Sequence, residues 1–435
     1  MRDLVVMLLV LAGSLAALKR PWIGILVWTW LSIMNPHRLS WGWVYDANLA
    51  FFAAFATMIG ALLTKDERAS PFKGSAPVIL VIFMAWMTLS WLFGIDREGD
   101  YPQWSKVMKI DVMIVAALVL LHSKRHIFAL AWVVTGSLAL LGAKGGLFTL
   151  MTGGGFHVYG PPQSFIEDNN EFALALVITI PLLRFLQLQL RGVLARRSMT
   201  VVMVLCAASA LGSQSRGALL AIGASTLFLW WRGRNRFSGG IFMIVTALSL
   251  LAFMPDTWSD RMDSITDYQG DRSAMGRISA WWNAWNLAFH YPFGVGFDAA
   301  RPELFAIYSP YPDFVHAAHS IYFQILGNHG FIGLFLFVLM WAATWHSAGW
   351  LRTHGSKIEA AKWCADLGSM CQVSLLGYAV GGAFLSLAYF DLPYNIMVLV
   401  VITRVWIQSR GWEREPVYLP GWKTIPGLAL QAKVS

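Results

Sequence analysis

Apolar runs of membrane-spanning length recur along the whole chain, and they constrain its fold more than any other feature. A helix needs about 20 mostly apolar residues to cross the hydrocarbon core of a bilayer. Runs that approach or reach this length lie near residues 4–18, 21–34, 47–63, 77–94, 106–121, 127–142, 171–190, 199–212, 216–231, 240–254, 320–347, 368–389 and 394–408. Because the first two and the last are short, the pattern predicts about 12, or 12 to 13, transmembrane helices in an all-α polytopic integral membrane protein.

Only 13% of the 435 residues are charged, whereas a soluble domain carries about 25%. The segment Leu4–Leu18 has no convincing cleavage site and another apolar run follows it, so we expect no cleavable signal peptide. Three cysteines provide neither a disulfide framework nor a zinc-ligand spacing.

The basic residues fall in alternate loops. They gather at 19–20, 65–73, 124–125, 191–197, 232–236, 352–362 and 410–414. The positive-inside rule assigns these loops to the cytoplasm, so the intervening segments 35–46, 95–105, 143–170, 255–319 and 390–393 are expected outside. The net charge of +9 is therefore a topology signal. It is scattered over many short loops, which argues against a nucleic-acid partner.

Runs and loops divide the chain into six segments. We expect N-terminal transmembrane helices (1–142), a glycine-rich outer loop (143–170), central transmembrane helices (171–254), a large outer loop with an amphipathic helix (255–319), C-terminal transmembrane helices (320–408) and a cytoplasmic tail (409–435). Within the large loop, residues 274–290 have helical spacing with an apolar stripe that includes Trp281. Pro292 to Gly296 is a tight turn that ends this helix.

Arg216 opens an apolar run directly after Ser215, which predicts an arginine at the outer end of a helix. The helix N-terminus adds backbone donors and a partial positive charge. A guanidinium holds two oxygens at once and never deprotonates, which suits a diphosphate. The alternative is an arginine that snorkels to the interface. We favour a functional role, because charge near hydrocarbon is expensive.

The large outer loop carries a second candidate cation. It contains four arginines and eight acids, so most of these arginines are expected to be neutralised by neighbouring carboxylates. Arg277 follows Gly276 and shares a helix face with Trp281, which would place a cation beside an interfacial aromatic ring. A solvated surface arginine is an equally good interpretation. Arg301 in the same loop is a further candidate substrate contact.

His316, His319 and Tyr322 are spaced three residues apart where the polar loop meets an apolar helix, so all three are predicted to share one helix face. His319 could act as a general base, which requires only a neutral imidazole and a hydroxyl acceptor. Two nearby cations would lower its pKa and help keep it neutral. The alternative is a structural histidine at a helix start. No metal-binding pattern accompanies it, and we expect no metal or other cofactor.

Weaker candidates lie in the other outer segments. Asp168 and Asn170 precede or open an apolar run, where they would cap a helix or bind sugar hydroxyls. Lys144 in the glycine-rich segment could contact a phosphate. Asp96 and Glu98 form an acid-x-acid element that could hold a divalent metal, but solvated loop carboxylates are the better interpretation.

Taken in order, these elements resemble the bacterial O-antigen ligases, within a superfamily that includes O-antigen polymerases and protein O-oligosaccharyltransferases. The matching stretches are Ser215-Arg216-Gly217, Gly276-Arg277 before the tryptophan-rich helix, Pro292 to Gly296, and His319-Ser-x-Tyr322 with Leu326-Gly327 and Gly330 beyond. The core of the resemblance covers about residues 168–400. Residues 142–146 and 159–171 resemble a subgroup described as O-glycosylation ligases.

The resemblance implies a metal-independent inverting glycosyltransferase with a GT-C-like helical fold in the bacterial inner membrane and an active site facing the periplasm. The donor would be a glycan on undecaprenyl diphosphate, and the acceptor a sugar hydroxyl of lipid A–core, in lipopolysaccharide biosynthesis. Arg216 and Arg277 would bind the diphosphate, and His319 would activate the acceptor.

Two alternatives remain open. The same motifs fit a polymerase or a protein O-oligosaccharyltransferase of the superfamily. From another class, a flippase for lipid-linked glycans would place ionisable groups and broken helices near the midplane, often in repeated halves. The chain shows no clear internal repeat, and its arginine, glycine and histidine features gather at the outer ends of the runs. This placement favours catalysis at the interface. The sequence does not define an oligomeric state.

Overall fold

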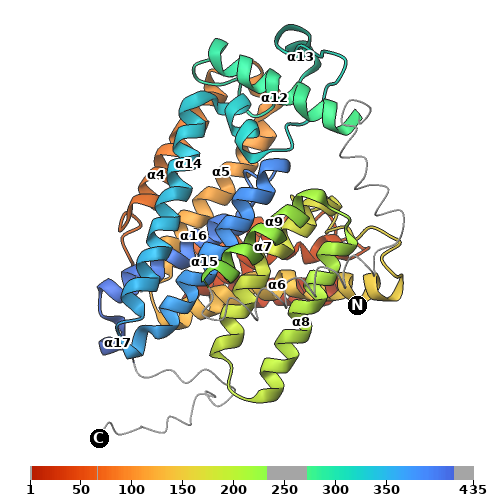
Figure 1. Ribbon diagram of the computed structural model, residues 1–435. Helices are drawn as coiled ribbons and strands as arrows, with labels where there is room; N and C mark the ends of the chain where they lie inside the picture. The colour runs from red at the N-terminus through yellow and green to blue at the C-terminus, as the bar shows by residue number, and fades with distance from the viewer. Residues whose placement is uncertain (1, 66, 233–271, 416–435) are drawn as a thin grey trace, which may run out of the picture.

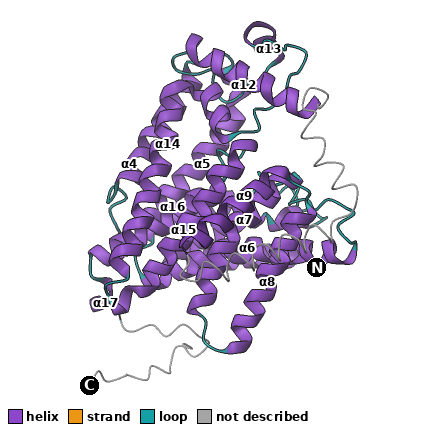
Figure 2. Ribbon diagram, viewed as in Figure 1, coloured by secondary structure: helices purple, strands orange, loops and turns teal. Residues whose placement is uncertain are grey.

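The computed structural model describes residues 2–65, 67–232 and 272–415, and in these ranges every regular element is a helix (Figure 2). The expected run at 240–254 and residues 255–271 of the large loop lie outside this range, as does most of the tail. The helices are α1 (Arg2–Lys19), α2 (Pro21–Met34), η1 (Pro36–Leu39), α3 (Leu49–Leu63), α4 (Ser75–Leu92), α5 (Arg97–Leu120), α6 (Lys124–Met151), α7 (Asn169–Gln189), α8 (Val193–Gly212), α9 (Arg216–Arg232), α12 (Arg272–His290), α13 (Pro302–Tyr308), α14 (Ile321–Gly355), η2 (Glu359–Ala361), α15 (Lys362–Gly381), η3 (Gly382–Phe384), α16 (Asp391–Gln408) and α17 (Gly411–Arg414).

Six helical stretches in the described ranges are long and apolar enough to cross a membrane: α4, α6, α7, α8, α14 and the stretch around α15. Three shorter apolar helices, α2, α3 and α9, accompany them. The predicted all-helical, polytopic character is therefore confirmed. The total of 12 to 13 spans and the GT-C-like arrangement stay predictions.

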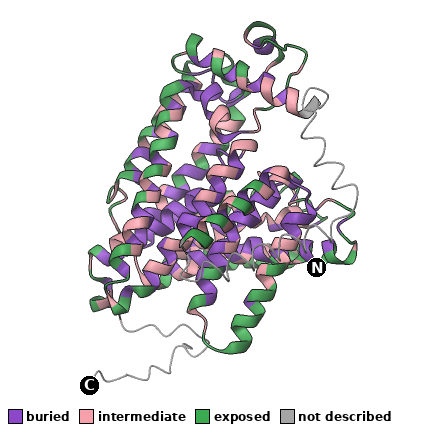
Figure 3. Ribbon diagram, viewed as in Figure 1, coloured by how far each residue is buried: buried purple, intermediate pink, exposed green. Residues whose placement is uncertain are grey.

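Helix α7 forms the centre of the bundle (Figure 3). It packs against α6, α8, α9 and α15, and its apolar residues are buried around its whole circumference. A helix that is hydrophobic on all sides belongs in such an interior position. Its N-terminus is fixed by the Asp168 side chain, which accepts a hydrogen bond from the Asn170 amide at 2.8 Å. The central helix thus presents a well-defined first turn.

Two of the expected outer loops are shorter than predicted. The glycine-rich loop was expected from residue 143, but α6 continues to Met151. Its glycines serve close helix packing, since a Cβ on Gly146 would lie 2.1 Å from the Leu205 carbonyl oxygen of α8. The expected loop 95–105 is also mostly helical, because Asp96 caps α5 by accepting from the Gly99 amide. Polar and glycine residues at these positions were therefore misread as loop signals.

Different elements lie at the two ends of the bundle. Helices α12 and α13 lie at one end, near the start of α14, and α17 lies at the other (Figure 1). The Ile95 amide donates to the Val295 carbonyl at 3.0 Å, which joins two of the segments predicted to be outside. At the opposite end the Lys124 amide donates to Glu415. This grouping agrees with the predicted alternation, while the side that faces the periplasm stays a prediction.

A break in α14 creates contacts that hold together the end of the bundle where α12 and α13 lie. Gly330 has φ 68° and ψ −171°, outside the helical region. The break leaves carbonyl groups without helical partners, and two of them are satisfied from other elements: the Gly296 amide donates to Asn328, and Trp86 Nε1 donates to His329 at 2.9 Å. Gly294 and Gly296 both have positive φ here, as the predicted tight turn requires.

Candidate functional site

The first turn of α7 is the point where the predicted site segments meet. Asn169 Nδ2 donates to the Ser213 carbonyl at 2.6 Å, which fixes the segment before α9. Glu171 Oε1 lies 3.9 Å from His319 Nδ1, in the segment before α14. Both α7 side chains are buried. One helical turn therefore joins two stretches that are about a hundred residues apart in the sequence.

Arg216 begins α9, as the sequence predicted. The preceding turn is rigid. Gln214 has φ 55°, its Oε1 accepts from His157 Nε2 at 2.9 Å, and its Nε2 donates to the Gly154 carbonyl at 3.1 Å. Ser215 is buried and its Oγ caps α9 by accepting from the Ala218 amide. Ser215 thus has a structural role, and the half-buried Arg216 side chain starts from a fixed backbone.

His319 lies in the loop and not on the helix. The predicted shared helix face of His316, His319 and Tyr322 is wrong, because α14 begins only at Ile321. His319 has φ 39°, a left-handed conformation that is uncommon for residues other than glycine. The two imidazole rings are nevertheless close, with centroids 4.8 Å apart. Tyr322 turns away from them and donates its hydroxyl to the Ala379 carbonyl.

Helix α12 holds the histidine segment in place. Trp281 Nε1 donates to the Ala318 carbonyl at 2.8 Å, and its ring stacks on Phe323 at 5.0 Å. Gly276 lets the helix approach the His316 ring, since a Cβ there would lie 3.0 Å from it. Arg277 follows, and it lies close enough to both Glu171 and His319 for its charge to act on them.

A further contact links the starts of α9 and α14. A Cβ on Gly217 would lie 3.4 Å from Phe384, and one on Gly382 would lie 2.7 Å from Ile321. The η3 turn therefore packs against the first residues of both helices. Together with α7 and α12, it brings the segments that carry Arg216, Arg277 and His319 to one region.

The electrostatics of this region keep His319 uncharged. Burial, the neighbouring His316 ring and the positive charge of Arg277 lower the pKa of His319 from 6.5 to about 4, against an opposing effect of Asp168. Its Nδ1 is buried and has no hydrogen-bond partner among the described residues. A neutral imidazole beside a guanidinium is suited to accept a proton near a bound anion.

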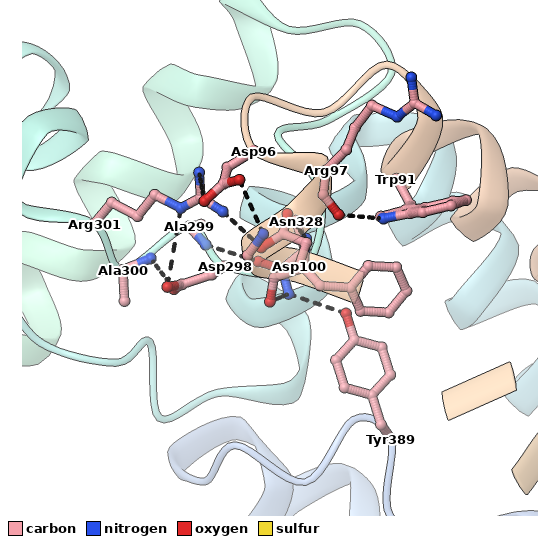
Figure 4. Close-up of polar contacts among 12 residues, drawn as sticks. Trp91, Asp96, Arg97, Asp100, Asp298, Ala299, Ala300, Arg301, Asn328 and Tyr389 are labelled. Atoms are coloured by element: carbon pink, nitrogen blue, oxygen red, sulfur yellow. Dashed lines mark hydrogen bonds and ion pairs between the residues drawn. The ribbon is translucent and has the colours of Figure 1, made fainter. Parts of the chain in front are cut away.

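Arg301, a further candidate substrate contact, forms ion pairs with carboxylates of the protein itself (Figure 4). Its Nη2 lies 2.6 Å from Asp100 Oδ1, and Asp96 and Asp298 lie 3.7 and 4.0 Å from other guanidinium nitrogens. Asp100 also accepts from the Phe297 amide at 2.8 Å. Arg301 therefore joins the loop after α12 to the start of α5, and the ion pair with Asp96 adds to this connection. The expectation that loop arginines are neutralised by acids describes Arg301 well.

Lys144 lies on a separate cavity. It is exposed on α6 and lines a space of about 270 Å³ with mainly apolar walls, among them Leu141, Phe148 and Phe172. His157 lines the same space and bonds to Gln214, so this cavity lies next to the turn before Arg216. Asn170, the other weak candidate, forms a local contact: its Nδ2 donates to the carboxylate of Asp168 at 2.8 Å.

Glu171 is the residue that sequence reasoning missed. It directly follows Asn170 in the polar segment that was expected to cap a helix or to bind sugar hydroxyls. In the structure it is the nearest carboxyl group to His319 Nδ1 among the ion-pair contacts of the described residues. Nothing local marks this role, because the contact joins positions far apart in the chain.

Fold and site together define a polytopic helical membrane protein with arginine and histidine segments gathered at one buried turn. Residues 201–338 match the model of a family described as O-antigen ligase, and residues 1–191 match a family of unknown function (DUF5935). The first match spans Arg216, Arg277 and His319. No curated protein matches the chain. The match over residues 201–338 supports membership of the O-antigen ligase superfamily.

Proposed function

We propose that this protein is an O-antigen ligase. It would transfer a polysaccharide from undecaprenyl diphosphate to a sugar hydroxyl of lipid A–core at the periplasmic face of the inner membrane, with inversion at the anomeric carbon and without a metal. The observation that carries the proposal is the meeting of the Arg277 and His319 segments at Glu171. Both segments lie within the match to the O-antigen ligase family, and Glu171 lies in the part of the chain that precedes it.

The two arginines would bind the diphosphate. When the bond between sugar C1 and the phosphate oxygen breaks, its electron pair stays on the diphosphate, which gains negative charge. Fixed guanidinium groups stabilise this charge more in the transition state than in the ground state. Arg216 starts from a rigid turn and Arg277 from a helix packed on the histidine segment, so little reorganisation would be needed.

His319 would take the proton. As the acceptor hydroxyl attacks C1 from the face opposite the diphosphate, its proton would pass to the imidazole. Since Nδ1 faces Glu171, Nε2 is the nitrogen that would accept. At 3.9 Å the two groups are not hydrogen-bonded. If this contact shortens when the donor binds, as catalytic hydrogen bonds often do, the carboxyl group of Glu171 would accept from Nδ1 and hold that tautomer, the usual role of a third group behind a general base. Bound diphosphate would offset the charge of Arg277 and raise the basicity of His319.

The lipid part of the donor needs an apolar surface next to the diphosphate. The cavity beside Lys144 offers apolar walls adjoining the turn before Arg216, and its one lysine could meet a phosphate at the mouth. We assign the first isoprene units to this cavity. The remainder of the chain would lie in the bilayer.

Two neighbouring activities of the superfamily use the same donor. A protein O-oligosaccharyltransferase would transfer to a protein hydroxyl, and a polymerase would transfer to a second lipid-linked glycan. The competing class is a flippase, which moves the donor across the membrane without breaking it.

The proposal is tested with purified protein, undecaprenyl-diphosphate-linked glycan and lipid A–core, without ATP. We expect glycosylated lipid A–core, an unchanged rate in EDTA, and rates at least about 100-fold lower in Arg277→Ala and His319→Ala. Normal membrane insertion and melting temperature of these variants separate catalysis from folding. Product on an added protein or on a second lipid-linked glycan would select one of the two neighbouring activities. Movement of the glycan across liposomes without any transfer would contradict all three.

A further inference from the structure

A second cavity adjoins the histidine segment. It has a volume of about 140 Å³ and is lined by residues from α12, from the 297–300 loop, from 316–318, from the first turns of α14 and from the stretch after η3. None of its lining residues belongs to the proposed arginine pair. The side chains that matter for its chemistry are Asn283, Asp298, His316, Phe323, Gln324 and Ser386.

Two polar atoms on this cavity have no partner in the described part of the chain. The Asn283 side chain is 1% exposed. Its Nδ2 donates to the Ala299 carbonyl at 2.9 Å, but its Oδ1 accepts no hydrogen bond. Ser386 Oγ is buried and equally without a partner. Buried polar atoms are nearly always hydrogen-bonded, so two unsatisfied ones on the same cavity indicate an occupant with hydroxyl groups.

The rest of the lining fits a sugar ring. Aromatic rings of Phe297, Phe305 and Phe323 face a space kept open by the small side chains of Ala280 and Ala284. Phe323 is held by its stacking on Trp281. An apolar wall with a few placed polar groups is typical of a small-molecule site. A cavity of about 150 Å³ holds one six-membered ring of benzene size, so this one has room for the six-membered ring of one sugar.

The walls of the cavity are rigid before any ligand binds. Asn328 Oδ1 accepts from the Ala299 amide and its Nδ2 donates to the Phe297 carbonyl, both at 3.1 Å. The salt bridges of Arg301 hold the same loop from the other side (Figure 4). A preformed site loses little entropy on binding, because its side chains are already ordered.

The cavity adjoins the proposed base. His316 lines it, and the His316 and His319 rings are 4.8 Å apart. We propose that this cavity binds the terminal pyranose of the acceptor, with Asn283 Oδ1 and Ser386 Oγ bonding to hydroxyls that do not react. This inference rests on the proposed function and deepens it, since it assigns the acceptor to a cavity of its own beside the 316–319 segment.

Ser386→Ala tests the assignment, because its Oγ makes no internal hydrogen bond that the substitution would remove. With donor saturating and lipid A–core varied, we expect the acceptor KM to rise roughly three- to tenfold, the effect of one lost hydrogen bond. The donor KM and kcat should stay within about twofold. Ala300→Leu, which narrows the cavity from a half-buried loop position, should raise the acceptor KM further.

Ser225→Ala is the matched control. Ser225 is also buried with an unpartnered Oγ, but it lies on α9 and does not line the cavity, so its acceptor KM should equal that of the wild type. Unchanged acceptor KM in both Ser386→Ala and Ala300→Leu, or a rise in donor KM alone, would overturn the inference while leaving the ligase proposal intact. Absence of transfer by the wild-type protein would instead refute the proposed function itself.

Discussion

At the scale of single residues, the proposed chemistry depends on one imidazole that stays neutral beside a cation. The ordinary pKa of histidine is 6.5, and burial, His316 and Arg277 together lower that of His319 to about 4. At neutral pH nearly every molecule therefore carries the base in its proton-accepting form. The cost is lower basicity, which binding of an anionic donor near Arg277 would partly restore.

This shift predicts the pH dependence of transfer. For the free enzyme, kcat/KM for the donor should be flat between about pH 5.5 and 7 and should fall at lower pH as His319 becomes protonated. Its acid limb should have an apparent pKa near 4. The limb of kcat, which reports the donor complex, should lie at higher pH. Initial rates across pH, with folding monitored by circular dichroism, give both limbs. A limb of kcat/KM at the ordinary pKa of 6.5 would contradict the assignment of His319 as base.

Glu171 supplies a second prediction, as a positioning residue behind His319. Glu171→Ala should lower kcat by roughly 10- to 100-fold, a part of what a positioned base contributes, with little change in acceptor KM. Glu171→Gln keeps an oxygen at the position from which the carboxyl group would accept from Nδ1 in the donor complex, so this variant should recover most of the activity. Steady-state kinetics of both variants decide the point. If glutamine were no better than alanine, orientation of the imidazole would not be the function of Glu171.

At the scale of elements, the pair of Asp100 on α5 and Arg301 before α13 holds together the end of the bundle where α12 and α13 lie. The Asp100 side chain is 2% exposed and accepts from both Arg301 and the Phe297 amide. Removing one partner of a buried pair leaves an uncompensated charge. Asp100→Ala should therefore lower the free energy of unfolding by about 3–5 kcal/mol, seen as a lower melting temperature in detergent.

Asp298 is the matched control for this element. It lies 4.0 Å from Arg301 and its side chain is 56% exposed, so Asp298→Ala should cost less than about 1 kcal/mol. Equal destabilisation by the two alanine variants would mean that burial does not set the strength of these contacts. Loss of transfer in Asp100→Ala at a temperature where it stays folded would show that the loop position also matters for chemistry.

At the scale of the whole molecule, apolar periodicity predicted the helical bundle well. The bounds of α2, α7 and α9 agree with the predicted runs to within two residues at each end. The errors occurred where one residue type serves two purposes. Glycines at 145 and 146 were interpreted as loop formers, whereas they let α6 and α8 touch. The histidine spacing suggested a helix face, but the helix starts two residues after His319.

The site could be predicted only in part, because its contacts are long-range. Arg216 at a helix start was visible from a polar turn followed by an apolar run. The pairing of His319 with Glu171, and the enclosure of Arg301 by carboxylates, depend on packing between distant helices. Local patterns contain no information about such contacts.

The predicted orientation can be tested by labelling. Glu303 and Ser356 are exposed near opposite ends of the long helix α14, and the three native cysteines are buried, so background labelling should be low. In spheroplasts, a membrane-impermeant maleimide should label Glu303→Cys at once and Ser356→Cys only after disruption of the membrane. The reverse pattern would place the histidine segment on the cytoplasmic side and exclude a periplasmic ligase.

The central claim is that one diphosphate binds where the Arg216, Arg277 and His319 segments meet. A cryo-electron microscopy structure of the protein in nanodiscs with undecaprenyl diphosphate tests it most directly. The account predicts phosphate density within ion-pairing distance, about 4 Å, of both arginines, with His319 Nε2 facing the open side. Density for the diphosphate at Lys144 or elsewhere, without contact to Arg216 and Arg277, would contradict the account.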